Sequence, residues 1–162
     1  MHGSFLYYAL LIALAIALLV AAFTDLRRRQ IDNWLNAGVA LGAPLFWYAS
    51  GLLLPDIGYQ LAIALAAFAV CAGLFAIGAM GGGDVKLLTA LALWIEPTSF
   101  LRLIIIMALA GGLLTVIFGA MHIIRRNREK IAIPYGIAIS IAGLWVIADS
   151  YFPAGHPGAA LG

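Results

Sequence analysis

The sequence predicts an all-α membrane protein, a polytopic bundle of about six transmembrane helices. Of its 162 residues, 65% are hydrophobic and only 10% are charged, and the mean hydropathy is +1.07. A soluble domain usually carries about 25% charged residues and about half apolar ones. The apolar residues also form runs close to the roughly 20 residues that a spanning helix needs. These observations exclude an ordinary soluble domain and predict that a bilayer is the solvent for most of the chain.

The first two apolar runs predict transmembrane helices over residues 5–23 and 34–54. No Lys or Arg precedes the first run, whereas three arginines at positions 27–29 follow it. A cleaved secretory signal has the opposite order, so we expect a retained helix with its N-terminus outside. In the second run, Gly38 and Gly42 have the four-residue spacing that lets two membrane helices approach closely.

The third and fourth runs flank a series of glycines. A turn is predicted over residues 55–58, a helix over residues 59–79, and a break at the glycines of positions 81–83. The fourth run, residues 84–96, would be only ~20 Å long at 1.5 Å per residue, shorter than the ~30 Å hydrocarbon layer. Either the bilayer thins here or the helix begins below the membrane surface, which would put Asp84 slightly inside the membrane.

The last two runs predict helices over residues 98–124 and 133–151. We treat residues 1–152 as a single membrane-embedded domain. The remaining residues, 153–162, are small and rich in glycine, which is typical of a loose C-terminal tail.

The basic residues predict the orientation of the bundle. With the N-terminus outside, three loops face the cytoplasm, over residues 24–33, 80–83 and 125–130. Eight of the nine Lys and Arg residues lie in or beside these loops, and only Arg102 lies near the other side. The positive-inside rule therefore supports this topology. The same basic residues could equally serve only to contact anionic lipid headgroups.

This topology places two carboxylates, Asp25 and Asp84, at the same cytoplasmic level on different helices. An ionisable group among apolar runs is costly, and it therefore predicts a functional site. Two adjacent carboxyl groups do not both ionise easily, so one keeps a proton while the other is charged. The charged one can take a proton from water, and the neutral one can donate a hydrogen bond to a peptide carbonyl. Such a pair predicts amide hydrolysis without a covalent intermediate.

Structural alternatives exist for each carboxylate. Asp25 could form an ion pair with Arg28 or Arg29, three and four positions further along a continuing helix. Asp84 could be the N-cap of the fourth helix. Asp32 fits ordinary N-cap and turn chemistry before the second helix.

The remaining polar and aromatic residues suggest no cofactor. Lys86 lies two positions beyond Asp84, so on a helix it points to another face and is expected to extend to the membrane interface. The single cysteine, Cys71, excludes a disulfide within the chain, and the three histidines are widely scattered. We therefore expect no metal, no cofactor and no nucleic-acid partner. The tryptophans fit interface belts or packing, and they are Trp34, Trp47, Trp94 and Trp145.

Three segments resemble the prepilin peptidases, a branch of the G-x-G-D intramembrane aspartyl proteases. The first is Gly81-Gly82-Gly83-Asp84 followed by Val85-Lys86-Leu87, and the second is the segment from Asp25 to Leu35. The third is Pro134-Tyr135-Gly136, similar to the Pro-Tyr-Gly motif at the last helix of that family. Asp32 stands where the family often has proline. The resemblance implies catalytic Asp25 and Asp84, with substrate-binding or motif roles for Gly81, Gly83, Lys86, Asn33, Pro134, Tyr135 and Gly136.

The resemblance also implies a substrate and a location. The larger members carry an extra domain with paired cysteines that methylates the new N-terminus, and this sequence has neither that length nor those cysteines. It resembles the short, peptidase-only members that serve Flp or tight-adherence pili. The implied partner is a prepilin with a short basic leader, a glycine before the cut and an apolar helix. The implied location is the bacterial inner membrane, with the active site at its cytoplasmic face and no N-methyltransferase activity.

Two other classes of function remain open from the sequence. The same carboxylates could form the proton relay of a small proton-coupled transporter or channel. The chain could also be a structural membrane subunit of a secretion or pilus machine, which would need no aspartate pair. The sequence does not give the oligomeric state.

Overall fold

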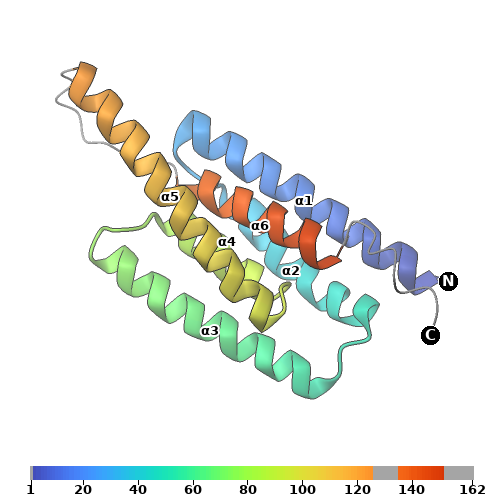
Figure 1. Ribbon diagram of the computed structural model, residues 1–162. Helices are drawn as coiled ribbons and strands as arrows, with labels where there is room; N and C mark the ends of the chain where they lie inside the picture. Colours follow the sequence, from blue (N-terminus) through green and yellow to red (C-terminus); the bar gives the residue numbers. More distant parts are fainter. Residues whose placement is uncertain (1, 126–134, 152–162) are drawn as a thin grey trace, which may run out of the picture.

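The computed structural model describes residues 2–125 and 135–151, and it is helical throughout these segments apart from short turns (Figure 1). In chain order, the six helices of the described residues are α1 (His2–Arg28), α2 (Asn33–Ser50), α3 (Leu54–Ala76), α4 (Gly82–Ala92), α5 (Pro97–Arg125) and α6 (Tyr135–Tyr151). The predicted all-α bundle is thereby confirmed. Pro134, most of the predicted loop over residues 125–130 and the tail 153–162 lie outside the described residues.

The turn predicted over residues 55–58 is wrong. α2 ends at Ser50 because Gly51 adopts the left-handed conformation, with φ 67° and ψ 27°, and its N–H caps the helix. Pro55 instead lies in the first turn of α3, where its missing N–H leaves no intrahelical bond unmade. Asp56 follows it in the same turn, where a negative charge complements the helix dipole. The chain therefore reverses over residues 51–53.

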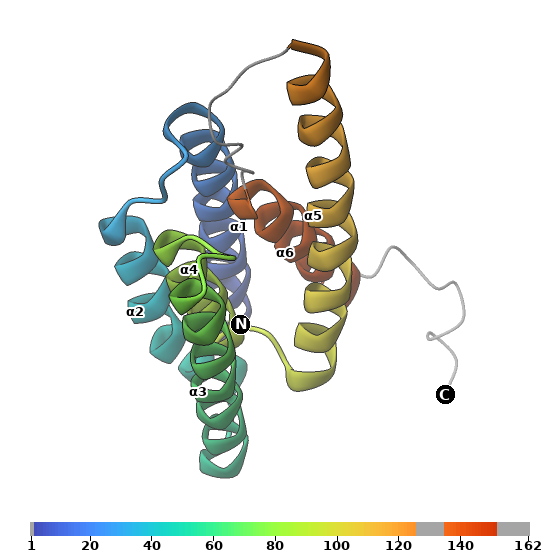
Figure 2. The ribbon, with the colours of Figure 1, turned by 90° about the vertical axis from the view of Figure 1, so that its left-hand side faces the viewer.

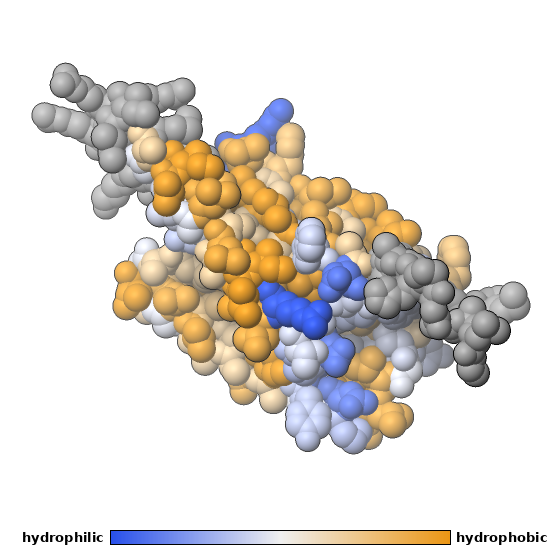
Figure 3. All heavy atoms as spheres, in the orientation of Figure 1, coloured by the Kyte–Doolittle hydropathy of each residue, from blue (hydrophilic) through white to orange (hydrophobic). Residues whose placement is uncertain are grey.

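The outer surface of the bundle is apolar. Three helical segments are long and apolar enough to cross a membrane: Phe5–Arg28, Leu54–Ala76 and Pro97–Ile117. Only 17–22% of the residues in their apolar windows are buried inside the protein, so most of their side chains point outward. Apolar residues dominate the face over α3 and α5 (Figure 3). The fold is a helical membrane bundle with many exposed leucines and isoleucines, as expected for a surface that faces lipid.

The shortest helix, α4, forms the centre of the bundle. It packs against α2, α3 and α6, while α6 in turn packs against α1 and α5, and Figure 2 shows α6 lying between those two helices. Leu87, Leu88 and Leu91 of α4 are each 1% exposed or less. Because neighbouring helices cover α4, its eleven residues need not span the bilayer themselves.

Side-chain hydrogen bonds fix the end of α4. Carbonyls at a helix end have no intrahelical partner, and here the Trp47 indole N–H donates to the Leu93 carbonyl at 2.7 Å. The Tyr151 hydroxyl donates to the Trp94 carbonyl at 3.1 Å. The Trp94 indole N–H in turn donates to the Val39 carbonyl of α2 at 2.7 Å. Two of the four tryptophans therefore serve internal packing.

The other two tryptophans are on the surface. Trp34 is 66% exposed and Trp145 is 63% exposed. Such positions suit the amphipathic indole at a lipid-facing or interfacial site.

The two glycines of α2 make different contacts. A Cβ built on Gly42 would lie 2.6 Å from Cζ2 of Trp94, whereas one built on Gly38 meets nothing within 4 Å. Trp94 cannot easily give way, because its indole is hydrogen-bonded to Val39 and its ring stacks on Phe46 with centroids 5.0 Å apart. Position 42 is therefore the place on α2 where any side chain would collide with Trp94.

We expect Gly42→Ala to destabilise the protein by about 1–3 kcal/mol, because overpacking displaces a fixed indole. The matched control, Gly38→Ala, adds the same methyl group to open space and is expected to be neutral or stabilising by about 0.5–1 kcal/mol through helix propensity. Thermal unfolding of both variants in one detergent measures the difference. Equal unfolding temperatures would refute the role given to Gly42.

Candidate active site

Asp25 and Asp84 line one cavity of about 370 Å³. Asp25 comes from the last turns of α1, and Asp84 comes from the first turn of α4. They are 5% and 8% exposed, respectively. The rest of the cavity is formed by the α1–α2 turn and the residues before α4, namely Arg29, Gln30, Ile31, Asp32, Asn33, Gly81, Gly82 and Gly83.

Asp25 sits beside the beginning of another helix. α1 continues past residue 23 to Arg28, so Asp25 lies on a continuous helix. The backbone N–H groups of Gly136 and Ile137, in the first turn of α6, face its carboxyl group. The N-terminus of a helix is a favourable place for a negative charge. Oδ2 of Asp25 is buried and makes no hydrogen bond within the described part of the chain.

The close approach of α6 to Asp25 depends on glycine. A Cβ at Gly136 would lie 2.7 Å from Oδ2 and 2.8 Å from Cγ of Asp25. Any larger residue at this position would displace either the carboxyl group or the start of α6. This explains in physical terms why the Pro-Tyr-Gly segment ends in glycine.

The alternative structural roles find support only in part. Among the described residues, no ion pair within 4 Å joins Asp25 to Arg28 or Arg29, although the charge of Arg29 does act on Asp25. The N-cap prediction for Asp84 is wrong, because α4 begins at Gly82 and its N-cap is Gly81. Asp32 does occupy the N-cap position of α2, but its side chain makes no capping hydrogen bond.

Asp84 is held by the glycines that precede it. It is the third residue of α4, and its carboxyl group lies beside the backbone N–H of Gly81, as in the return half of a capping box. A Cβ on Gly81 would lie 2.9 Å from Oδ2 of Asp84. Gly81 therefore leaves the space that the carboxyl group occupies.

Gly83 brings the start of α4 against the α1–α2 turn. A Cβ on Gly83 would lie 3.2 Å from Cβ of Ile31 and 3.3 Å from both its N and its O. The Asn36 side-chain amide donates to the Gly83 carbonyl at 3.2 Å. One turn later, the Lys86 ammonium donates to Oδ1 of Asn33 at 2.7 Å. These contacts fix α4 against α2 and position Asp84 in the cavity.

The two carboxyl groups interact electrostatically across the cavity. When both are charged they repel each other, so the arrangement favours a state in which one of them keeps a proton. A cavity that holds one neutral and one charged carboxyl group can both donate to a carbonyl oxygen and accept a proton from water.

Some of the other residues predicted for the site line the aspartate cavity and others do not. Gly81, Gly83 and Asn33 line the cavity with the aspartates, and Lys86 reaches it only through Asn33. The Tyr135 ring packs on α5, where its Cε1 lies 3.2 Å from the position of a Cβ on Gly111, and it does not line the cavity. Pro134 lies outside the described residues. In the part of the chain that the structure describes, no group of three or more His, Cys, Asp or Glu could hold a metal ion.

Asn36 is a residue beside the candidate site that sequence reasoning missed. It is 4% exposed although it is polar, and its amide holds the carbonyl of the motif glycine Gly83. A signal was present, because Asn36 follows Asn33 by three positions and so lies on the same face of α2.

Comparison with known proteins agrees with this geometry. Residues 12–119 match the model of the type IV leader peptidase family, and the matched region contains both aspartates. Neither the comparison with curated proteins nor the one with solved structures gave a significant match. Because the matched region covers more than half of the sequence, the chain belongs to the type IV leader peptidase family.

Proposed function

We propose that this peptidase is an aspartyl endopeptidase that removes the basic leader from type IV, Flp-like prepilins, with Asp25 and Asp84 as the catalytic pair. The observation that carries the proposal is the burial of both carboxyl groups in one cavity of a lipid-embedded bundle. Oδ2 of Asp25 is also buried without a hydrogen-bond partner among the described residues, so the fold itself does not use this acceptor.

The chemistry follows from a shared proton. The charged carboxylate takes a proton from water while the water oxygen bonds to the scissile carbonyl carbon. The neutral carboxyl group donates its proton to the carbonyl oxygen, which gives a neutral tetrahedral diol. Proton transfer to the peptide nitrogen then lets the C–N bond break, releasing an amine and an acid and leaving one proton on the pair. The burial of the site strengthens each of these electrostatic interactions.

A groove beside the cavity supports a helical membrane substrate. α2 and α3 both pack on α4 but not closely on each other, and between them lies a cavity of about 340 Å³. Small side chains such as Ala37, Ala40 and Ala90 line it, and it shares Asn33 with the aspartate cavity. Small residues let helices approach closely in lipid. An apolar prepilin helix lying in this groove would present its leader junction to the aspartates.

A proton-coupled transporter is less well supported. A relay needs titratable groups along a path across the bundle. The buried acids Asp25 and Asp84 lie together at one end, whereas Asp56, Glu96 and Asp149 are exposed. Between these ends, the described core consists mainly of apolar side chains.

Replacing either aspartate tests the proposal. We expect Asp25→Asn and Asp84→Asn each to lower leader removal by at least about 10³-fold, since each removes one half of the acid–base pair. Co-expression with a candidate prepilin, followed by its mobility shift, measures the activity. Asp149→Asn, which removes an exposed carboxylate at the other end of the bundle, is the matched control and should process normally. Wild-type processing by either active-site variant would exclude that residue as catalytic.

A second prediction concerns the start of α6. Gly136→Ala places a methyl group against the Asp25 carboxyl group, and a misplacement of about 1 Å can lower the rate about 10²-fold. Gly112→Ala on α5, where a Cβ meets nothing within 4 Å, adds the same methyl group away from the site and should leave the rate unchanged. If both variants cleave prepilin equally well in proteoliposomes, α6 does not position Asp25.

A third prediction concerns the support of the glycine motif. Asn36→Leu keeps the branched shape and the number of heavy atoms, with somewhat larger terminal groups, but removes the hydrogen bond to Gly83. We expect the cleavage rate to fall about tenfold as Asp84 loses its fixed position. Thr115→Val, which removes a 2.7 Å hydrogen bond to a carbonyl within α5, is the control and should cleave normally. Thermal unfolding of both variants shows whether stability accounts for the change. An unchanged rate in Asn36→Leu would contradict the positioning role.

A further inference from the structure

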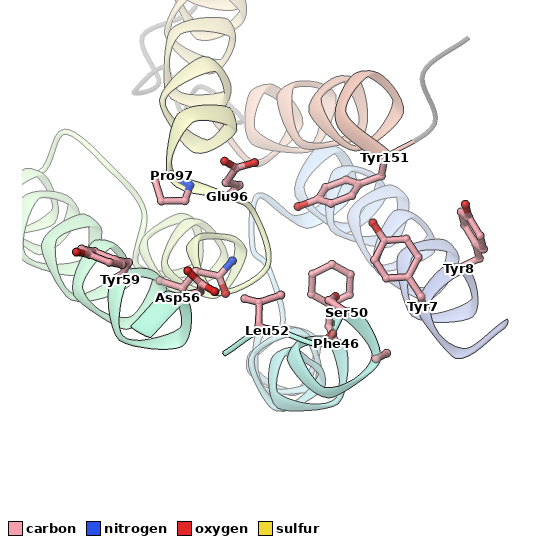
Figure 4. A pocket seen from close by; sticks show the side chains of 12 residues that line it. Tyr7, Tyr8, Phe46, Ser50, Leu52, Asp56, Tyr59, Glu96, Pro97 and Tyr151 are labelled. Carbon is pink, nitrogen blue, oxygen red and sulfur yellow. Dashed lines mark hydrogen bonds between the residues drawn. The ribbon is translucent and has the colours of Figure 1, made fainter. Parts of the chain in front are cut away.

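A second and larger cavity lies at the opposite end of the bundle. Its volume is about 730 Å³, within the roughly 300–1,000 Å³ typical of small-molecule sites. It is lined by the N-terminal part of α1, the end of α2, the start of α3, the α4–α5 turn and the end of α6 (Figure 4). None of the residues that line it belongs to the aspartate cavity.

The charge of this second cavity is negative. Asp56, in the first turn of α3, and Glu96, in the α4–α5 turn, line it, and among the described residues no Lys or Arg does. The nearest candidate cation on these elements, Arg102, is instead paired with Asp149 at 3.4 Å. The cavity therefore favours a cation over an anion.

Three stacked or edge-on rings form an aromatic wall. The ring centroids of Tyr7 and Phe46 are 5.4 Å apart, those of Tyr7 and Tyr151 are 6.2 Å apart, and those of Phe46 and Tyr151 are 6.0 Å apart. All three residues line the cavity, and Figure 4 shows their side chains gathered together. Aromatic faces attract ammonium groups and also cover the apolar body that carries them.

The buried side-chain amide of Gln60 indicates, independently of the charge, that a ligand here should carry a hydrogen-bond donor. Gln60 lines the cavity and is only 5% exposed. Its Oε1 has no hydrogen-bond partner in the described part of the protein. Leaving such an acceptor unpaired is unfavourable, so a ligand that brings an N–H donor is favoured once the Gln60 amide turns toward it. A primary ammonium group meets this need, whereas a quaternary ammonium has no N–H to donate.

We propose that this second cavity binds an organic primary ammonium compound, with its charge near Asp56 and Glu96 and its apolar part against the aromatic wall. Two sources share this chemistry: a free amine and the headgroup of phosphatidylethanolamine. Leu53 and Leu54, beside the cavity mouth at the start of α3, are 69% and 84% exposed, and they could contact the acyl chains of such a lipid. The site is independent of peptide cleavage.

Calorimetric titration with phenethylamine tests the binding. The purified full chain in a non-ionic detergent should bind phenethylamine saturably, with a dissociation constant of about 1 mM or lower. Phenylpropionate, which has the same body and the opposite charge, should not bind. Asp56→Asn and Glu96→Gln should each weaken binding about threefold to tenfold. Thr115→Val, a change on α5 outside the cavity, should bind as the wild type does.

Lipid nanodiscs distinguish the two sources. If the ligand is the lipid headgroup, phenethylamine should bind more weakly in nanodiscs that contain phosphatidylethanolamine than in nanodiscs of phosphatidylglycerol alone. Equal affinity in both assigns the cavity to a free amine. The proposal is overturned if phenethylamine does not saturate, if phenylpropionate binds equally well, or if both acid variants bind like the wild type while unfolding at its temperature. Leader cleavage is measured separately, so failure here leaves the proposed function intact.

Discussion

The contact between Gly83 and the backbone of Ile31 is the constraint on which the aspartate cavity depends. The hypothetical Cβ of Gly83 approaches both N and O of Ile31 at 3.3 Å, so the first turn of α4 lies directly on the turn that follows α1. Asn36 closes the contact by donating to the Gly83 carbonyl. Gly83 is needed for this close packing and not for an unusual backbone conformation, because its φ is not positive. A side chain here would separate the two segments that carry the carboxyl groups.

The short α4 can carry one half of the site because both of its ends are fixed by other helices. At its start, Gly83 and Lys86 are tied to α2. At its end, the carbonyls of Leu93 and Trp94 accept hydrogen bonds from Trp47 and Tyr151. Non-helical backbone is tolerated at membrane depth only where protein or a wet cavity satisfies it. The turn after α4 meets that condition through side chains of α2 and α6.

The sequence was sufficient to predict the helices but not their contacts. Apolar runs of helical length separated by polar turns predicted six helices, and the depth of Asp25 and Asp84 followed from counting them. The turn at residues 55–58 was predicted wrongly, because proline breaks a helix interior but is tolerated in a first turn. The packing role of Trp94 and the hydrogen bond of Asn36 could not be predicted. In a membrane helix the lipid-facing side is apolar as well, so the sequence pattern does not distinguish the buried face.

The distribution of charge relates the cavity to its proposed substrate. Arg27, Arg28, Arg29 and Lys86 lie at the end of the bundle that holds the aspartates, whereas Arg102 at the other end is neutralised by Asp149. Basic residues remain preferentially on the cytoplasmic side, so this asymmetry favours a cytoplasmic aspartate cavity. Those arginines would repel a basic leader if they also lined the cavity. Of these residues only Arg29 lines the cavity, together with three carboxylates, Asp25, Asp32 and Asp84. The surface around this end is therefore basic while the cavity itself is acidic, which agrees with the basic leader of the proposed substrate.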